Sequence, residues 1–108
     1  MKKLAYTKEA RTINIERKEY IRSEFVKEFA LRVAEGYCQL CRNYAPFINK
    51  KGQPFLEVHH IDFLSKGGLD AIDNVIALCP NCHRKMHANE SQKDISTLKK
   101  RAEDYARR

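Results

Sequence analysis

The sequence has no long apolar run. None of its hydrophobic stretches approaches the roughly 18 apolar residues of a helix that spans a bilayer, and Met1-Lys2-Lys3 is not followed by the apolar core of a signal peptide. Tryptophan is also absent, and the 43% hydrophobic and 32% charged residues are typical of an ordinary globular domain. We therefore expect a cytoplasmic protein without a membrane partner.

Internal repeats and low-complexity segments are absent too, and 108 residues suffice for about one domain. A domain of this size buries only around two-thirds of the surface that its unfolded chain exposes, so its apolar core alone is marginal. Lys and Arg outnumber Asp and Glu by 21 to 14, which favours a polyanionic partner without excluding a domain that binds no anion. Because the excess is spread along the chain, a folded surface must carry any nucleic-acid binding.

The first zone of the chain is an N-terminal extension, residues 1–36. Within it, residues 17–35 place apolar side chains among charges at mostly three- to four-residue spacing, which predicts an amphipathic helix that ends at Gly36. Residues 1–16 show no sustained pattern and stay unassigned. The predicted apolar stripe, which needs a partner, consists of Tyr20, Ile21, Phe25, Phe29, Leu31 and Val33.

The last zone, residues 89–108, is predicted to be a closing helix. Ser91 with Asp94 resembles a capping box. The apolar residues that follow in helical register are Ile95, Leu98, Ala102 and Tyr105.

Four cysteines form two pairs of equal spacing, Cys38-Gln-Leu-Cys41 and Cys79-Pro-Asn-Cys82. Each pair suits a turn whose sulfurs point at one tetrahedral zinc ion, and two such knuckles make a closed structural site. Disulfides are disfavoured without a secretory signal, and a redox C-x-x-C motif should occur once, beside a βαβ pattern. We predict a zinc site that clamps both ends of the middle zone, residues 37–88, and makes folding depend on the metal.

All four histidines fall within 29 residues, as the neighbours His59 and His60 and the pair His83 and His87. Histidines four residues apart on a helix project from one face and can grip a metal ion. Residues 57–61 form a predicted strand, whose neighbours point to opposite sides, so one of the adjacent histidines can join that metal while the other is available as a base. Any one of these histidines could be an ordinary surface or core residue, but their clustering favours a second, catalytic metal site.

Together these residues resemble the HNH endonucleases. The similarity is carried by Val58-His59-His60-Ile61, by Asn74 and by the segment from Cys79 to His87. It extends over roughly residues 37–88 and is closest to the zinc-containing branch that includes modification-dependent restriction enzymes. The resemblance implies an α+β fold, with a ββα-metal (His-Me finger) core and a four-cysteine zinc site, flanked by N-terminal and C-terminal helices in a single compact domain. Its strands would lie near 56–61 and 74–78, and its helix would start near residue 80.

The resemblance also implies roles for the site residues. His60 would be the general base that deprotonates the attacking water, and Asn74 would orient the site by fixing the loop between the strands or the tautomer of His60. One divalent cation would be held by His59, His83 and His87. An imidazole at position 59 replaces the aspartate that is more frequent in the family, and imidazole suits several transition metals. Magnesium or manganese is expected, and the imidazole ligands also allow nickel or cobalt.

Three basic residues are candidates for contacts to DNA phosphates. Arg84 and Lys85 lie between the two helical histidines, and Lys66 lies in the preceding loop region. Plain solvation of these side chains is the alternative. Asp62, close behind His60, is a weaker candidate for a supporting residue.

The leading hypothesis is a metal-dependent DNA endonuclease that nicks duplex DNA and leaves a 5′-phosphate and a 3′-hydroxyl. One alternative is a zinc-stabilised DNA-binding module without cleavage, although every expected site position is filled. Another is the catalytic subunit of a larger restriction or recombination assembly. A bacterial or phage origin is expected, and the sequence leaves open whether the protein forms a homodimer.

Overall fold

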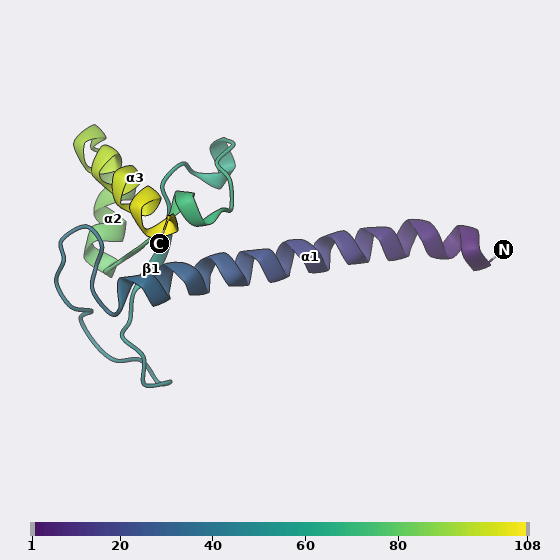
Figure 1. Ribbon diagram of the computed structural model, residues 1–108, viewed down its shortest axis with the longest axis horizontal. Helices are drawn as coiled ribbons and strands as arrows, with labels where there is room; N and C mark the ends of the chain where they lie inside the picture. The colour runs from purple at the N-terminus through teal and green to yellow at the C-terminus, as the bar shows by residue number, and fades with distance from the viewer. Residues whose placement is uncertain (1, 108) are drawn as a thin grey trace.

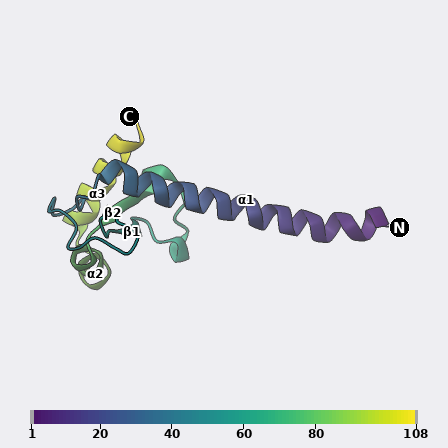
Figure 2. The same ribbon diagram turned by 90° about the horizontal axis from the view of Figure 1, so that it is seen from below.

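The computed structural model describes the backbone of residues 2–107 and the side chains of residues 15–107. Figures 1 and 2 show one long helix, with the rest of the chain gathered around its C-terminal end. The elements are α1 (Lys2–Ala34), β1 (Glu57–His60), β2 (Val75–Leu78), α2 (Pro80–Asn89) and α3 (Gln92–Ala106). Because α1 extends beyond the folded core, the molecule is 59 Å long and 33 Å wide, and the expected compact shape holds only for the core.

Helix α1 begins earlier than predicted, since it includes nearly all of the segment that showed no pattern. It ends where the sequence predicted. Glu35 and Gly36 have positive φ angles of 51° and 88°, and a β-carbon on Gly36 would lie 2.7 Å from the ring of Tyr44. Glycine is therefore required at this turn, both for its backbone angle and for the close approach of the ring.

The buried face of α1 differs from the predicted stripe. Among the α1 residues whose side chains the structure describes, 15–34, the buried ones are Val26, Ala30 and Ala34, each four residues apart. In the predicted stripe only Phe29 and Val33 are half-buried, and the prediction was wrong for the exposed residues Tyr20, Ile21, Phe25 and Leu31. Alanine has no bulk beyond its β-carbon, so a face built on alanine lets the helix lie close to the sheet.

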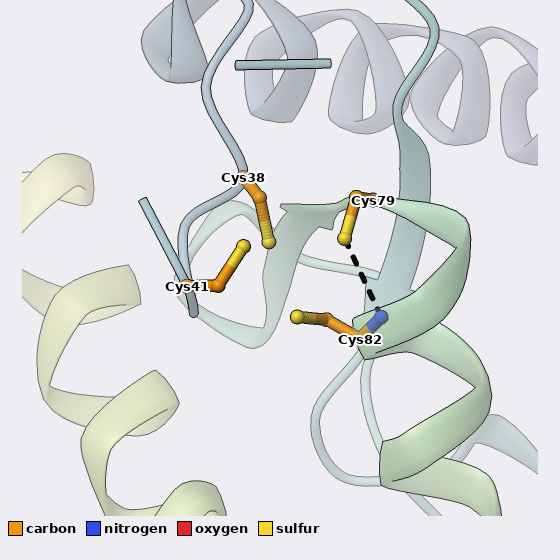
Figure 3. Close-up of side chains that lie close together, drawn as sticks. All are labelled: Cys38, Cys41, Cys79 and Cys82. Atoms are coloured by element: carbon orange, nitrogen blue, oxygen red, sulfur yellow. Dashed lines mark hydrogen bonds between the residues drawn. The ribbon is translucent and has the colours of Figure 1, made fainter. Parts of the chain in front are cut away.

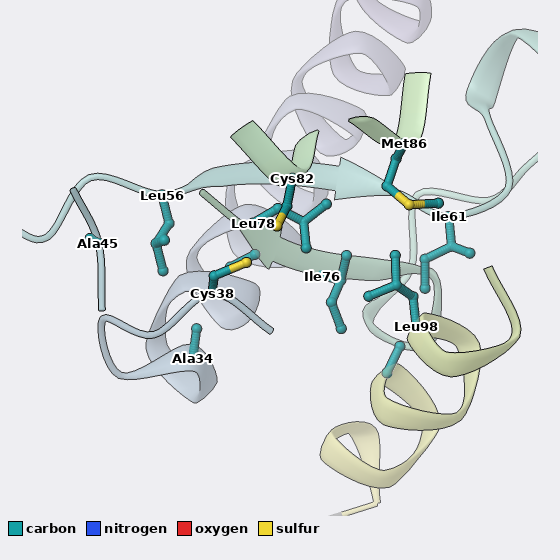
Figure 4. Packing of buried hydrophobic residues seen from close by; sticks show 12 residues of the cluster. Ala34, Cys38, Ala45, Leu56, Ile61, Ile76, Leu78, Cys82, Met86 and Leu98 are labelled. Atoms are coloured by element: carbon teal, nitrogen blue, oxygen red, sulfur yellow. The ribbon is translucent and has the colours of Figure 1, made fainter. Parts of the chain in front are cut away.

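Strands β1 and β2 form an antiparallel pair within a residue or two of the predicted bounds. Strand β2 is buried along its whole length, with α1 against one face and α2 and α3 against the other. Val75 packs with α1, whereas Ile76 and Leu78 face the cluster that includes Met86 (Figure 4). The sheet is therefore the middle layer of the core.

The register of the hairpin decides where the two adjacent histidines point. His59 is paired with Ile76, and His60 is paired with Val75. Val58 packs on the α1 side of the sheet, and strand residues alternate between faces. His60 therefore lies on the α1 side and His59 on the α2 side.

The two C-terminal helices follow the predicted pattern. Helix α2 has Cys79 as its N-cap and Pro80 in its first turn, where a missing N–H costs nothing. In α3 the Ser91 hydroxyl accepts a hydrogen bond from the Asp94 amide at 3.4 Å, which confirms the predicted cap. The predicted apolar register of α3 is also confirmed, with Leu98 and Ala102 fully buried. Among the residues that the structure describes, no helix combines the length and hydrophobicity needed to cross a membrane.

Candidate metal centres and active site

The four cysteines meet at one end of the hairpin, as their spacing predicted. Figure 3 shows their sulfurs pointing toward one another from the loop after α1 and from the start of α2. All four are free thiols, and their sulfur atoms lie within 4.8 Å of one another. Four sulfurs bound to one zinc ion at 2.3 Å would lie about 3.8 Å apart, so the cluster suits such an ion.

Hydrogen bonds to the backbone shape the first cysteine turn. The Cys38 amide donates to the Asn43 carbonyl, and the Arg42 amide donates back to the Cys38 carbonyl, each at 2.9 Å. Arg101 of α3 donates to the carbonyls of Gln39 and Leu40 at 2.6 and 3.0 Å. Helix α3 therefore holds the first turn in place from outside the cluster.

The environment of Cys38 favours its thiolate. Burial of this thiol raises its pKa. Hydrogen bonds from the backbone at Cys79, Cys41 and Leu40 outweigh this effect and lower the pKa to about 7. Because the thiolate is the form that binds metals, this sulfur is prepared as a ligand.

Three of the four histidines form a second cluster. The ring nitrogens of His59, His83 and His87 lie within 4.8 Å of one another, and the Nε2 atoms of His83 and His87 are 3.2 Å apart. Two imidazoles on a tetrahedral ion at 2.0–2.1 Å would place their nitrogens about 3.4 Å apart. The predicted ligand set therefore has the spacing that one divalent cation requires.

His59 is the buried member of this cluster, with 2% of its surface exposed. Burial, followed by the charges of His83, His87 and His60, lowers its pKa to about 4. The ring is therefore neutral near pH 7 and keeps a lone pair for a metal.

Two residues that the sequence did not single out hold the helical histidines. His83 Nδ1 donates to Oε1 of Glu57 at 2.9 Å, which leaves its Nε2 for a cation. The ring of Phe63 stacks on His87 at a centroid distance of 4.9 Å. Glu57 and His59 lie two positions apart on a strand and therefore share one face of it. This spacing could have indicated from the sequence that Glu57 lies near the histidine cluster. Phe63 gave no comparable signal.

The structure places His60 apart from the three clustered histidines. Its Nε2 atom lies 2.9 Å from Oδ1 of Asp70, and both side chains are largely buried. Asp70 is ten residues away, across the loop between the strands, and no spacing in the sequence linked the two. The hydrogen bond from His60 lowers the pKa of Asp70, burial raises it, and Ser23 and Arg22 of α1 lower it further.

Asn74 ties the loop between the strands together. Its Oδ1 accepts from the Asp62 amide at 2.9 Å, and its Nδ2 donates to the carbonyls of Asp62 and Leu69 at 3.0 and 2.7 Å. These three bonds fix the loop through both the oxygen and the nitrogen of the side-chain amide. Asp62 itself is exposed and pairs with Lys99 at 3.1 Å.

The three candidate DNA contacts have different surroundings. Lys85 pairs with Asp94 at 3.3 Å, and Lys66 lies 3.9 Å from Glu90. Arg84 is exposed, and among the side chains that the structure describes none forms an ion pair with it. Arg84 is therefore the candidate whose charge is most available to a phosphate.

A strand pair followed by a helix, with three histidines from both elements close enough to bind one metal ion, is the arrangement of a ββα-metal fold. Residues 38–89 match the HNH endonuclease family. Both cysteine turns and all four histidines lie within the matched residues.

The chain is also similar to several named proteins. The chain is 45% identical over 85 residues to the type IV methyl-directed restriction enzyme EcoKMcrA of Escherichia coli K12, covering 77% of this chain and 31% of that enzyme. It is 46% identical over 37 residues to Anaredoxin of Nostoc sp., covering 34% of this chain and 49% of that protein. The solved structure of the type IV phosphorothioation-dependent restriction endonuclease ScoMcrA aligns with a TM-score of 0.62 and 33% identity, over 72% of this chain and 15% of that one. The chain thus spans less than half of each of these proteins.

Proposed function

We propose that the protein is a metal-dependent DNA endonuclease that nicks duplex DNA and leaves 5′-phosphate and 3′-hydroxyl ends. One observation carries the proposal. His59 from β1 and His83 and His87 from α2 bring their ring nitrogens within 4.8 Å of one another inside an HNH domain. The next residue, His60, has one ring nitrogen bonded to Asp70 and the other left to act as a base.

In the proposed chemistry, the metal ligand His59 and the base His60 act from opposite faces of β1. A divalent cation held by the three imidazoles would act as a Lewis acid for the charge on the phosphate oxygens. His60 accepts a proton from the attacking water while the water oxygen bonds to phosphorus and the bond to the 3′ oxygen breaks. The departing oxygen takes up a proton from solvent. Such a base typically contributes about 10²- to 10⁴-fold to the rate. Asn74 acts by holding the loop beside this site.

The cation is proposed to be magnesium or manganese, with nickel and cobalt also effective because all three ligands are imidazoles. The four-cysteine cluster is proposed to hold a structural zinc ion, since four thiolates in a closed tetrahedral set suit zinc. In this arrangement zinc stabilises the fold and the histidine-bound cation serves the reaction.

A second candidate is that the chain is the catalytic part of a larger restriction or recombination assembly. It is favoured by the coverage of 31% and 15% of the two restriction enzymes. Those relatives are named for methyl-directed and phosphorothioation-dependent restriction, and recognition of modified DNA could then belong to other parts of an assembly. For this chain we propose DNA as the partner and the cytoplasm of a bacterium or of a phage-infected cell as the setting.

The test is cleavage of supercoiled plasmid by the purified protein with magnesium, manganese, nickel, cobalt or no added metal. We expect metal-dependent open circles, and no open circles with His60→Ala. Zinc content, thermal unfolding and DNA binding of the variant show whether it stays folded. DNA binding without cleavage under every metal would instead support the binding-module alternative, and activity with magnesium alone would contradict the proposed metal range.

A further inference from the structure

The loop between the strands places one carboxylate beside His60. The Leu69 carbonyl accepts from Asn74 Nδ2 at 2.7 Å, which fixes the residue directly before Asp70. Gly68 lies so close to the Asp62 backbone that no side chain fits there. Asp70 is therefore held by a tight loop and cannot swing away freely.

The contact between Asp70 and His60 is close and largely shielded from water. Oδ1 of Asp70 lies 2.9 Å from Nε2 of His60, with side-chain exposures of 16% and 19%. A hydrogen bond to an ionised carboxylate is about twice as strong as one between neutral groups. The carboxylate accepts, so it selects the tautomer of His60 that carries its proton on Nε2 and has its lone pair on Nδ1.

Helix α1 lies on the same side of the sheet as His60. Ser23 and Arg22 of α1 lower the pKa of Asp70. These two residues lie outside the matched family region, residues 38–89.

We propose that Asp70 is a positioning residue that sets the tautomer and orientation of His60. The inference rests on the proposed role of His60 as general base. With Nε2 occupied by Asp70, Nδ1 is the atom that receives the proton from water.

The first test observes the tautomer directly and does not depend on activity. The wild-type protein, labelled with ¹⁵N-histidine and free of added divalent cation, is measured by two-bond nitrogen–proton correlation, with His60 assigned from His60→Gln. We expect His60 as the Nε2–H tautomer and loss of this preference in Asp70→Ala. The Nδ1–H tautomer in the wild type would overturn the inference.

The second test uses single-turnover plasmid nicking. Asp70→Asn should lower the maximal rate about 10- to 100-fold, the usual cost of losing a carboxylate behind a site histidine, while the protein concentration for half-maximal rate stays unchanged. Asp70→Glu should recover part of the rate. Asp73→Asn, which removes the same charge from an exposed residue of the same loop, is the matched control.

The outcomes separate the inference from the proposed function. If His60→Ala abolishes nicking but Asp70→Asn nicks like Asp73→Asn, the positioning role is wrong and the endonuclease proposal stands. A fall in zinc content and DNA binding that parallels the fall in rate would also overturn it, because Asp70 would then be merely structural. If the wild type never nicks, the proposed function fails, and the tautomer still decides whether Asp70 orients His60.

Discussion

Nδ1 of His83 lies 2.9 Å from Oε1 of Glu57, so a carboxylate on β1 holds an imidazole on α2. This bond crosses the two elements that supply the histidine cluster. It sets the tautomer of His83, because a ring that donates from Nδ1 has its lone pair on Nε2. It also makes the ring a better metal ligand by raising its basicity.

Replacing Glu57 by alanine should therefore weaken cation binding at the histidine cluster. We expect the dissociation constant for Mn²⁺, measured by titration calorimetry, to rise about 10- to 100-fold. Zinc content should not change, since the cysteine cluster is separate. Glu103→Ala removes an exposed carboxylate of α3 and serves as the control. Equal affinities in the two variants would show that Glu57 does not support the site.

Removing metal from the cysteine cluster should unfold the core. Zinc binding to such a site contributes about 10 kcal/mol or more, comparable to the entire stability of a small domain. Thermal unfolding followed by circular dichroism should lose its cooperative transition after treatment with a strong chelator. Zinc should restore the transition and magnesium should not. Cys82→Ser, at a buried position, should behave like the chelated protein. An unchanged transition after complete zinc removal would contradict the proposed structural role.

His59 should produce a characteristic pH dependence of stability. The folded protein holds the pKa of His59 at about 4, whereas the ordinary pKa of a histidine is 6.5. The unfolded chain then binds a proton at higher pH than the folded protein does, so the stabilisation is fully present above pH 6.5 and is lost as pH falls toward 4. Urea unfolding of the protein without added divalent cation should show this decline between pH 7 and pH 5. His59→Leu should show a smaller decline, and identical declines would contradict the burial effect.

Arg84 and Lys85 should differ in their importance for DNA binding. Lys85 already pairs with Asp94, whereas Arg84 is exposed without an ion pair among the described side chains. Arg84→Ala should weaken DNA binding and reduce the slope of log affinity against log salt by about one. Lys85→Ala should change both quantities less. Arg107→Ala, at an exposed position of the last turn, controls for loss of charge alone. A larger effect at Lys85 than at Arg84 would contradict this order.

Residue spacings within single turns and helices predicted several features of the structure. The turns at Cys38 and Cys79, the pair His83 and His87 and the cap at Ser91 depend on spacings of three or four residues. Such spacings have nearly the same geometry in every turn or helix, so the predicted elements and ligand sets could be read before any packing was known. The resemblance to HNH endonucleases rested on the same local segments.

Patterns over the chain were less reliable where several faces were equally apolar. Helix α1 carries bulky apolar residues around much of its surface, and the sequence favoured the stripe with Phe25 and Leu31. The sheet instead took the face with Val26 and Ala30. Only the close approach permitted by alanine distinguishes these faces, and that distinction exists only when a partner surface is present.

By itself, the sequence determined the kind of chemistry available: four thiols and four imidazoles at ligand spacing within one short zone. Only the tertiary structure decided which carboxylate forms a hydrogen bond with which histidine. Asp70 forms a hydrogen bond with His60 because hydrogen bonds from Asn74 fold the loop between the strands back toward β1. His60 faces α1 because the strand register places its side chain on that side of the sheet. Hydrogen bonds act over about 3 Å, so their partners are defined by positions in space that only packing between distant segments creates.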